Sequence, residues 1–182
     1  MNDSELYALS ARLGAALKRD NTFITCAESC TGGWVAKTIT DVSGSAGWFE
    51  RGFVTYGNQA KIDLLGVQPR TLEQHGEVSD PVVLEMVSGA LHAAFADYAV
   101  AISGIAGPDG GTIEKPVGTV WFGFAAADGE PFSQLMHFEG TRETVRRQAV
   151  HFALTTLLAH SERSSLTAAN RRLTDLLQSP GS

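Results

Sequence analysis

The stretch YAVAISGIAGPDGG, residues 98–111, decides the fold class. Its first five residues are almost entirely apolar, which is typical of a central strand buried on both faces of a sheet. Four glycines follow within the next nine residues, and glycine lets a backbone approach a ligand closely. Because ligands of open α/β sheets bind outside the carboxyl ends of the strands, the stretch predicts a ligand-binding loop there. An ordinary long turn is the alternative interpretation of this loop.

The segments on either side alternate between helix and strand patterns. Before residue 98, apolar spacing predicts helices over about 2–20, 33–40, 59–65 and 79–94 and strands over 22–26 and 48–56. After it, strands over 117–126 and 130–138 flank a turn, and a last helix begins after Thr141. This order predicts a three-layer α/β/α sandwich with a mixed, mostly parallel sheet of about five strands.

Length and composition indicate one domain with an appendage. The chain has 182 residues, of which 43% are hydrophobic, enough for a sizeable core. We assign residues 1–160 to the folded domain and 161–182 to a C-terminal extension that is partly helical or flexible, because Ser, Thr, Asn and Arg dominate the latter. An oligomer contact is the alternative role of the extension.

Charge and composition argue against several classes of function. A net charge of −6 argues against a protein that binds nucleic acid by neutralising phosphates. No stretch approaches the ~18 apolar residues of a membrane span, and the N-terminus lacks a signal-peptide pattern, so we expect a cytoplasmic protein without membrane contact. Cys26 and Cys30 are too few for a disulfide framework, and the five histidines lack metal-ligand spacing, so we expect neither a metal nor a cofactor.

The string AESCTGG, residues 27–33, lies where a strand turns into a helix and contains the candidate nucleophile Ser29. A hydroxyl at such a turn is exposed, and the backbone N–H groups after it can hold a phosphate or a developing oxyanion. Capping of the next helix is the alternative role of Ser29, and the spacing alone favours it. Cys30 is a weaker candidate nucleophile, because no histidine partner is evident.

Lys61 is the candidate base. A serine needs a base to become a nucleophile, and no histidine lies in a triad pattern. A lysine can serve if burial or a neighbouring positive charge keeps it neutral, and Tyr56, at the end of the preceding strand, could orient it or relay a proton. A solvated lysine on a surface helix is the alternative.

Two arginines at the start of the last helix are candidates for binding an anion. Arg142 and Arg146 lie four residues apart and therefore share one helix face. They could bind a phosphate or an acidic partner, and a solvated basic face is the alternative.

Taken together and in order, four strings resemble the CinA C-terminal domain family. They are AESCTGG at 27–33, RGFVTY at 51–56, SGIAGPDGG at 103–111 and KPVGTV at 115–120. The similarity spans about residues 4–160, and its stand-alone members are deamidases of nicotinamide mononucleotide (NMN).

This resemblance implies hydrolysis of the NMN carboxamide to nicotinate mononucleotide and ammonia, a step of the pyridine-nucleotide cycle. It also implies an α/β/α fold, no metal and a homo-oligomer. It assigns Ser29 as the nucleophile, with Lys61 as base and Tyr56 assisting. With the physical interpretation above, it gives a predicted substrate-binding set: Cys30, Thr31, Gly32, Gly33, Ser103, Gly104, Ala106, Gly107, Arg142 and Arg146.

The sequence departs from the family pattern in two places. Gly57 stands where Ser or Thr is expected, and the extension after residue 160 has no counterpart. The larger N-terminal domain of full-length members is also absent, so we expect no pyrophosphatase activity. Two other functions stay open: a catalytically silent binding paralogue, and a nucleotide-binding enzyme for another amide. Comparing NMN with nicotinamide and glutamine as substrates separates them.

Overall fold

A single five-stranded sheet forms the centre of the molecule. The structure is a computed structural model that describes residues 2–178, with the backbone alone for residue 165 and residues 168–178. The strands lie in the order β2-β1-β3-β4-β5. Their bounds are β1 Ile24–Glu28, β2 Phe53–Val54, β3 Tyr98–Gly104, β4 Thr119–Ala126 and β5 Phe132–His137.

The pairing confirms the predicted mixed, mostly parallel sheet. β1 pairs in parallel with β2 and with β3, whereas β4 runs antiparallel to both β3 and β5. Four strands therefore point one way and β4 opposes them. The carboxyl ends of β1, β2 and β3 meet at one edge, where a ligand site is expected.

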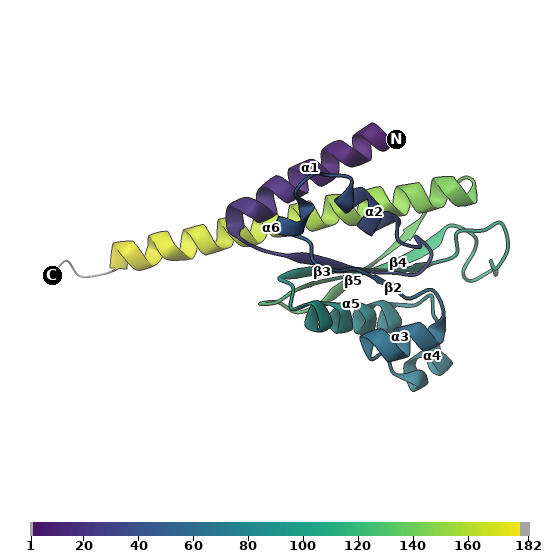
Figure 1. Cartoon of the computed structure of the whole chain (residues 1–182). Coiled ribbons are helices and arrows are strands. Elements are labelled where there is room, and N and C mark those ends of the chain that lie inside the picture. The colour runs from purple at the N-terminus through teal and green to yellow at the C-terminus, as the bar shows by residue number, and fades with distance from the viewer. Residues whose placement is uncertain (1, 179–182) are drawn as a thin grey trace.

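Helices cover both faces of the sheet, as the three-layer prediction requires (Figure 1). α1, α2 and α6 lie on one face, and α3, α4 and α5 lie on the other. The bounds are α1 Asp3–Asp20, α2 Trp34–Thr40, α3 Asn58–Leu65, α4 Pro69–His75, α5 Asp80–Ala94 and α6 Arg142–Gln178, with a short 3-10 turn at Ser45–Gly47. None of the helices in the described part of the chain is long and apolar enough to cross a membrane.

Strand β3 contributes side chains to two separate hydrophobic cores. Val100 and Ile102 are buried in the core beneath α1 and α6, whereas Ala99 and Ala101 are buried in the core against α5. Neighbouring residues of a strand face opposite sides of a sheet, so an apolar run without alternation is what a doubly covered strand requires. The prediction of a central buried strand is therefore confirmed.

One close backbone approach fixes α3 against α5. A Cβ atom added at Gly89 in α5 would lie 1.9 Å from the carbonyl oxygen of Leu65, the last residue of α3. Any larger residue at this position would push the two helices apart. Gly89 therefore sets how closely α3, which contains Lys61, packs against α5.

Several element boundaries differ from the prediction. The first strand covers Ile24–Glu28 rather than 22–26, and only Phe53–Val54 of the predicted strand 48–56 pairs in the sheet. Trp48 is fully buried outside any strand, so the apolar run there reflects packing rather than strand pairing. The helix Pro69–His75 was missed, although Pro69 at its start and Gly76 at its end are typical boundary residues.

The last helix continues beyond the predicted end of the domain. α6 runs from Arg142 to Gln178, so the backbone of most of the proposed extension is helical. Residues 179–182 lie outside the described residues. The division of the chain at residue 160 stays a prediction.

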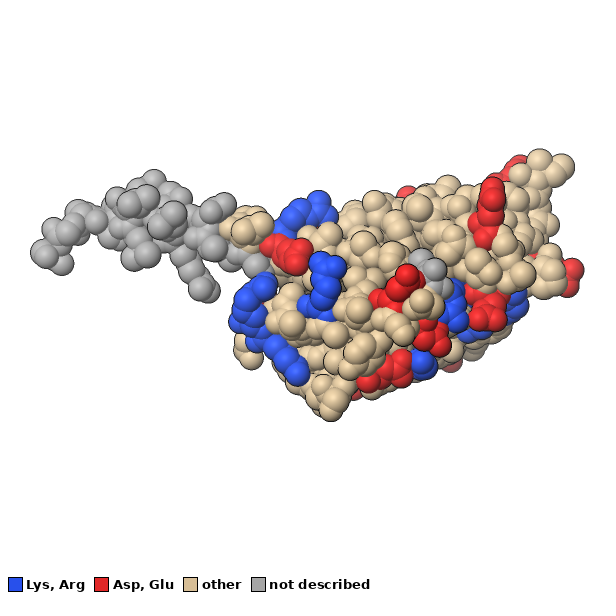
Figure 2. Space-filling view, turned by 90° about the horizontal axis from the view of Figure 1, so that it is seen from above, with Lys and Arg blue, Asp and Glu red and all other residues tan. Residues whose placement is uncertain are grey.

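On the face formed by α1 and α6, acidic and basic side chains are interspersed (Figure 2).

Candidate active site

A small polar pocket lies at the carboxyl ends of β1 and β3. Its volume is about 240 Å³. The turn after β1 contributes Ser29, the loop after β3 forms one wall, and the start of α6 contributes Arg142. The lining residues are Ser29, Cys30, Tyr56, Glu77, Val78, Ser103, Gly104, Ile105, Ala106, Gly107, Asp109, Gly110 and Arg142.

Ser29 lies directly after β1 and is held there by the sheet. Its backbone N–H donates to the carbonyl oxygen of Ile102 in β3 at 3.0 Å. Its side chain is 8% exposed at the floor of the pocket. The helix that follows has its N-cap at Gly33, without a side-chain cap from Ser29. The capping interpretation of Ser29 is therefore wrong, and its hydroxyl is left for another role.

The Lys61 side chain is fully buried and reaches Ser29. Its Nζ lies 3.4 Å from Ser29 Oγ, 3.0 Å from the carbonyl oxygen of Thr55 and 3.2 Å from that of Tyr56. Burial lowers the pKa of the Lys61 amine, although the charge of Glu77 and the Cys30 group act in the opposite direction. The alternative of a solvated surface lysine is wrong, because the side chain is 0% exposed.

Three polar atoms surround Nζ, and both an ammonium and a neutral amine can bond to them. A neutral amine has two N–H donors and one lone pair, whereas an ammonium has three donors and no acceptor. In the structure Nζ donates to Ser29 Oγ and to both carbonyl oxygens, and Ser29 Oγ donates to the Tyr56 carbonyl oxygen at 3.5 Å. In the neutral amine the two N–H groups can bond the carbonyl oxygens of Thr55 and Tyr56, which leaves the lone pair for the Ser29 hydroxyl proton. The arrangement can therefore remove a proton from Ser29 once the Lys61 amine is deprotonated.

Tyr56 contacts the lysine with its backbone rather than its ring. The side chain is 61% exposed, and its Oη accepts a hydrogen bond from Arg142 Nη2 at 3.2 Å. Arg142 also donates to the carbonyl oxygen of Gly107 at 2.9 Å. The Tyr56 ring and the Arg142 guanidinium therefore form one rim of the pocket, joined to the glycine loop. Gly57 has an extended backbone and open space around its Cα, so a Ser or Thr would fit there.

Arg146 holds the turn after β1 from behind. It donates to the carbonyl oxygens of Cys30 at 3.0 Å and Thr31 at 2.7 Å, and its guanidinium lies 5.2 Å from the centre of the Trp34 ring. It does not line the pocket. Of the two predicted arginines, the structure therefore brings only Arg142 to the cavity.

The backbone of the turn offers two free donors. The Gly32 N–H donates to the carbonyl oxygen of Ser29, and the Gly33 N–H donates to the carboxylate of Glu28. Within residues 2–178, the N–H groups of Cys30 and Thr31 donate no hydrogen bond to another residue. They are therefore the donors of this turn that remain available to a developing oxyanion.

The Cys30 side chain is a thiol rather than a thiolate. It is 6% exposed, and burial raises its pKa to about 12. Since the thiolate is the nucleophilic form of cysteine, the structure gives no support to Cys30 as nucleophile.

The glycine loop keeps its shape through close contacts and one lysine. Gly107 has a φ of +78°, and a Cβ there would lie 2.5 Å from a methyl group of Val117. Lys115 Nζ donates to the carbonyl oxygens of His75 at 3.1 Å and Val78 at 2.7 Å, which ties the loop to the segment between α4 and α5. Of the predicted loop residues, Ser103, Gly104, Ala106 and Gly107 all line the pocket.

Sequence reasoning missed several residues of the site. Thr31, Gly32 and Gly33 lie in the turn but do not line the cavity, whereas Glu77 and Asp109 do. Glu28 belongs to the motif AESCTGG but had no predicted role. The available signal was an acidic residue at the end of a short strand pattern, shortly before the helix that begins at Trp34.

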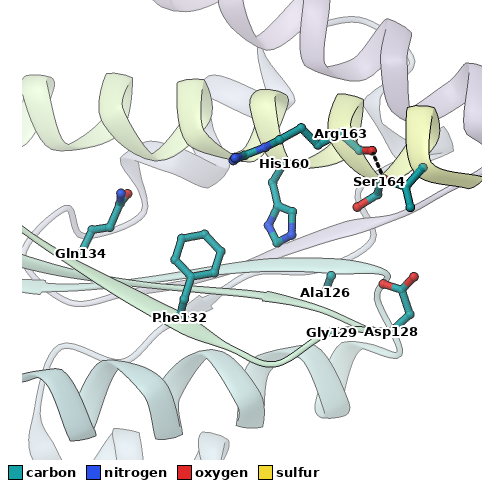
Figure 3. A pocket seen from close by; sticks show the side chains of 9 residues that line it. Ala126, Asp128, Gly129, Phe132, Gln134, His160, Arg163 and Ser164 are labelled. Atoms are coloured by element: carbon teal, nitrogen blue, oxygen red, sulfur yellow. Dashed lines mark hydrogen bonds between the residues drawn. The ribbon is translucent and has the colours of Figure 1, made fainter.

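A larger hollow lies at the opposite end of the sheet, between the β4–β5 hairpin and α6 (Figure 3). Its volume is about 760 Å³. The His160 ring points from α6 toward the sheet, 5.4 Å from the ring of Phe132, with Arg163 beside it on the helix (Figure 3). Burial and the charge of Arg163 lower the pKa of His160.

Comparison with known proteins decides the family. The model of the CinA C-terminal domain matches residues 6–160. The chain belongs to the CinA C-terminal domain family. This confirms the resemblance found in the sequence motifs.

Individual proteins match most of this chain. A protein of Escherichia coli strain K12, named nicotinamide-nucleotide amidohydrolase PncC, is 64% identical over 157 residues, which are 86% of this chain and 95% of that protein. A protein of the same name from Pseudomonas putida is 53% identical over 154 residues, covering 84% and 95%. The crystal structure of a CinA superfamily protein from Klebsiella pneumoniae has a TM-score of 0.84 at 39% identity, covering 90% of this chain and 99% of that one.

Proposed function

We propose that this chain hydrolyses the carboxamide of NMN to nicotinate mononucleotide and ammonia, with Ser29 as nucleophile, Lys61 as base and Tyr56 assisting. The observation that supports it most is the fully buried Lys61, whose Nζ lies 3.4 Å from Ser29 Oγ and whose pKa is lowered by burial. The names of relatives that are 53% and 64% identical favour an amidohydrolase over a silent binding paralogue.

The first half of the reaction forms an acyl-enzyme. The neutral Lys61 amine takes the Ser29 proton while Oγ attacks the carboxamide carbon, and the carbonyl oxygen becomes an oxyanion. The N–H groups of Cys30 and Thr31 are placed to stabilise that charge. The C–N bond then breaks, and the Lys61 ammonium returns its proton to the departing nitrogen, which leaves as ammonia.

The second half regenerates the enzyme. A water molecule gives a proton to Lys61 and attacks the ester carbon, and a second oxyanion forms at the same donors. The bond between carbon and Ser29 Oγ breaks, the proton returns to Oγ, and nicotinate mononucleotide leaves. The carbonyl oxygens of Thr55 and Tyr56 hold the amine in place through both halves. Tyr56 thus assists through its backbone.

The rest of the substrate lies along the glycine loop in this proposal. Residues 103–111 line the pocket beside Ser29 and present backbone at close range. Arg142 is the cation placed to attract the phosphate, because it is the arginine that lines the cavity. Arg146 is already bound to two carbonyl oxygens, so we assign it to the support of the turn. A cytoplasmic homo-oligomer remains part of the same proposal.

The decisive experiment measures ammonia release from NMN by wild type, Ser29→Ala and Ser88→Ala, with a chelator present. Ser88 is an exposed serine of α5 that donates to the carbonyl oxygen of Leu84 and serves as the matched control. We expect the Ser29 variant to lose at least about 10³-fold in kcat, as expected for loss of a nucleophile, and the control to keep its rate.

Three results would contradict the proposal in different ways. A folded wild type without activity on NMN would reject the substrate and favour the silent paralogue. Faster turnover of nicotinamide or glutamine would assign another amide. An active Ser29→Ala variant would reject the nucleophile while keeping the reaction.

A further inference from the structure

The residue before Ser29 is a buried carboxylate. Glu28 is the last residue of β1 and is 1% exposed. Its Oε2 accepts the N–H groups of Gly33 and Val35, both at 3.0 Å, and its Oε1 accepts the Ala36 N–H at 2.9 Å. The Cys26 thiol donates to the same Oε1 at 3.6 Å.

These bonds close the turn that contains Ser29 into a loop with fixed ends. The turn begins at the Glu28 backbone in the sheet and ends at the Glu28 carboxylate, with residues 29–32 between the two. Because the same residue holds both ends, the N–H groups of Cys30 and Thr31 keep a fixed orientation relative to Ser29.

The backbone of Glu28 also leads to the base. Its carbonyl oxygen accepts the Thr55 N–H at 2.8 Å, and the Thr55 carbonyl oxygen in turn accepts Lys61 Nζ at 3.0 Å. Through these hydrogen bonds Glu28 connects the turn that contains Ser29 to Thr55, which holds the Lys61 amine. Displacement of Glu28 would change the geometry of both partners.

The carboxylate also occupies the start of α2. Among the described residues, it forms no salt bridge, and backbone N–H groups at the helix start stabilise its charge. The carboxylate thereby satisfies the N–H groups of Gly33, Val35 and Ala36. With them occupied, the free donors of the turn are those of Cys30 and Thr31, beside Ser29.

We propose that Glu28 is a positioning residue for the reaction, which fixes the Ser29 turn and reserves the N–H groups of Cys30 and Thr31 for the oxyanion. This rests on the proposed function. Glu28 itself touches no reacting atom, so its removal affects kcat through the turn. A misplacement of about 1 Å can reduce a rate about 10²-fold.

The test compares Glu28→Gln and Glu28→Asp with Thr25→Val. The Gln variant keeps the length but places an NH₂ group against backbone donors, whereas the Asp variant keeps the charge but is too short to reach them all. Thr25 lies on the same strand, is also fully buried, and loses one side-chain bond to the Arg51 carbonyl oxygen in the Val variant. It therefore controls for a general loss of stability in β1.

We expect both Glu28 variants to lose about 10- to 100-fold in kcat for NMN, with KM within about twofold. Thr25→Val should keep kcat within about twofold of wild type, even if its melting temperature falls as far as that of the Glu28 variants. The rise of kcat/KM with pH should not move, because both variants keep the backbone carbonyl of residue 28 that holds Thr55, so Lys61 keeps its acceptors. Amide hydrogen exchange at Val35 and Ala36 should accelerate in the Glu28 variants and not in Thr25→Val.

Either of two results overturns the proposal. One is a folded Glu28 variant with wild-type kcat, and the other is a kcat loss in Thr25→Val equal to that of the Glu28 variants. If the wild type does not deamidate NMN, the proposed function fails separately. The exchange measurement then still decides whether Glu28 fixes the turn: unchanged protection at Val35 and Ala36 would reject it.

Discussion

The two ends of the sheet offer a ligand very different surroundings. At the carboxyl ends of β1 and β3, a pocket of about 240 Å³ contains a serine, a buried amine in reach of it and free backbone donors. At the other end, a hollow of about 760 Å³ lies between the hairpin and α6. The larger space contains His160, Arg163 and Asp128, but among its described lining residues none of these three side chains hydrogen-bonds to the hydroxyl of a serine or threonine.

This difference shows that the volume of a cavity does not identify the reactive site in this fold. The hollow owes its size to α6, whose start lies beside the pocket and whose later turns run past the hairpin (Figure 1). The residues of the pocket come from three segments that meet at one edge of the sheet: the turn after β1, the loop after β3 and the start of α6. A reaction needs groups within hydrogen-bond reach of each other, and in the described part of the chain the smaller of these two spaces provides them.

Replacing Lys61, the proposed base, should have the largest effect on kcat. If it does not, the contrast drawn between the two ends of the sheet is wrong. In Lys61→Met, the apolar side chain of similar length cannot accept the Ser29 proton. We expect kcat for NMN to fall about 10³-fold, within the range for loss of a general base. Steady-state kinetics check this, with circular dichroism to confirm folding. A variant with more than about a tenth of wild-type kcat would mean that another group is the base.

The pH dependence of kcat/KM should be the second largest effect, and it depends on the same Lys61 amine. Since burial lowers the pKa of Lys61 below 10.5, kcat/KM should rise with pH, about tenfold per unit while the amine is protonated, and level off before pH 10.5. The folded protein binds fewer protons than the unfolded chain between the two pKa values, so this group makes wild type more stable as pH rises through that window.

Measuring unfolding in denaturant at several pH values, for wild type and Lys61→Met, isolates this contribution. The stability of wild type relative to the variant should increase with pH. A constant difference would show that the Lys61 pKa is the same in both states.

Removing the cation of the pocket should have a smaller effect, confined to binding. Arg142→Ala loses a charge-assisted contact with the phosphate, so we expect KM for NMN to rise about 10- to 30-fold with kcat changed less. Tyr56→Phe is the control, because it removes only the hydroxyl that accepts from Arg142. An equal rise of KM in both variants would assign the effect to the rim rather than to the phosphate.

Variants of the larger hollow should have the smallest effect. His160→Gln and Gln134→Ala change two residues that line it, at the end of the sheet remote from Ser29. We expect kcat and KM for NMN within about twofold of wild type, as for surface changes away from a site. Tenfold slower turnover in either variant would show that the two ends are coupled.

The sequence predicted the site better where the signal was local. β3 and its loop were predicted correctly, because an unbroken apolar run followed by glycines fits a buried strand and its loop and few other structures. The contact between Ser29 and Lys61 joins residues 32 positions apart, so no local pattern shows it. The residues alone suggested Lys61 as the base but left a solvated surface lysine open, and the family resemblance supported the pair. The burial of Lys61 likewise depends on residues outside its helix, among them Ser29, Thr55 and Tyr56, which no local pattern of α3 reveals.

The errors came from patterns that two structures share. The apolar run 48–56 fits a strand, but Trp48 is buried by packing and only Phe53–Val54 pairs. A serine before a helix fits an N-cap, but Glu28 satisfies the N–H groups that a cap would serve. In both cases a side-chain contact that the local pattern does not show decided between two equally good interpretations.

The close approach at Gly89 has a consequence for protein engineering. The hydrogen atom that serves as its side chain lets α5 touch the end of α3, and α3 contains the amine on which turnover depends. Libraries that vary only the visible pocket would never sample this position. A search for variants with altered rates should therefore include the spacing of two outer helices among its variables, with Gly89 as the position that limits how close they come.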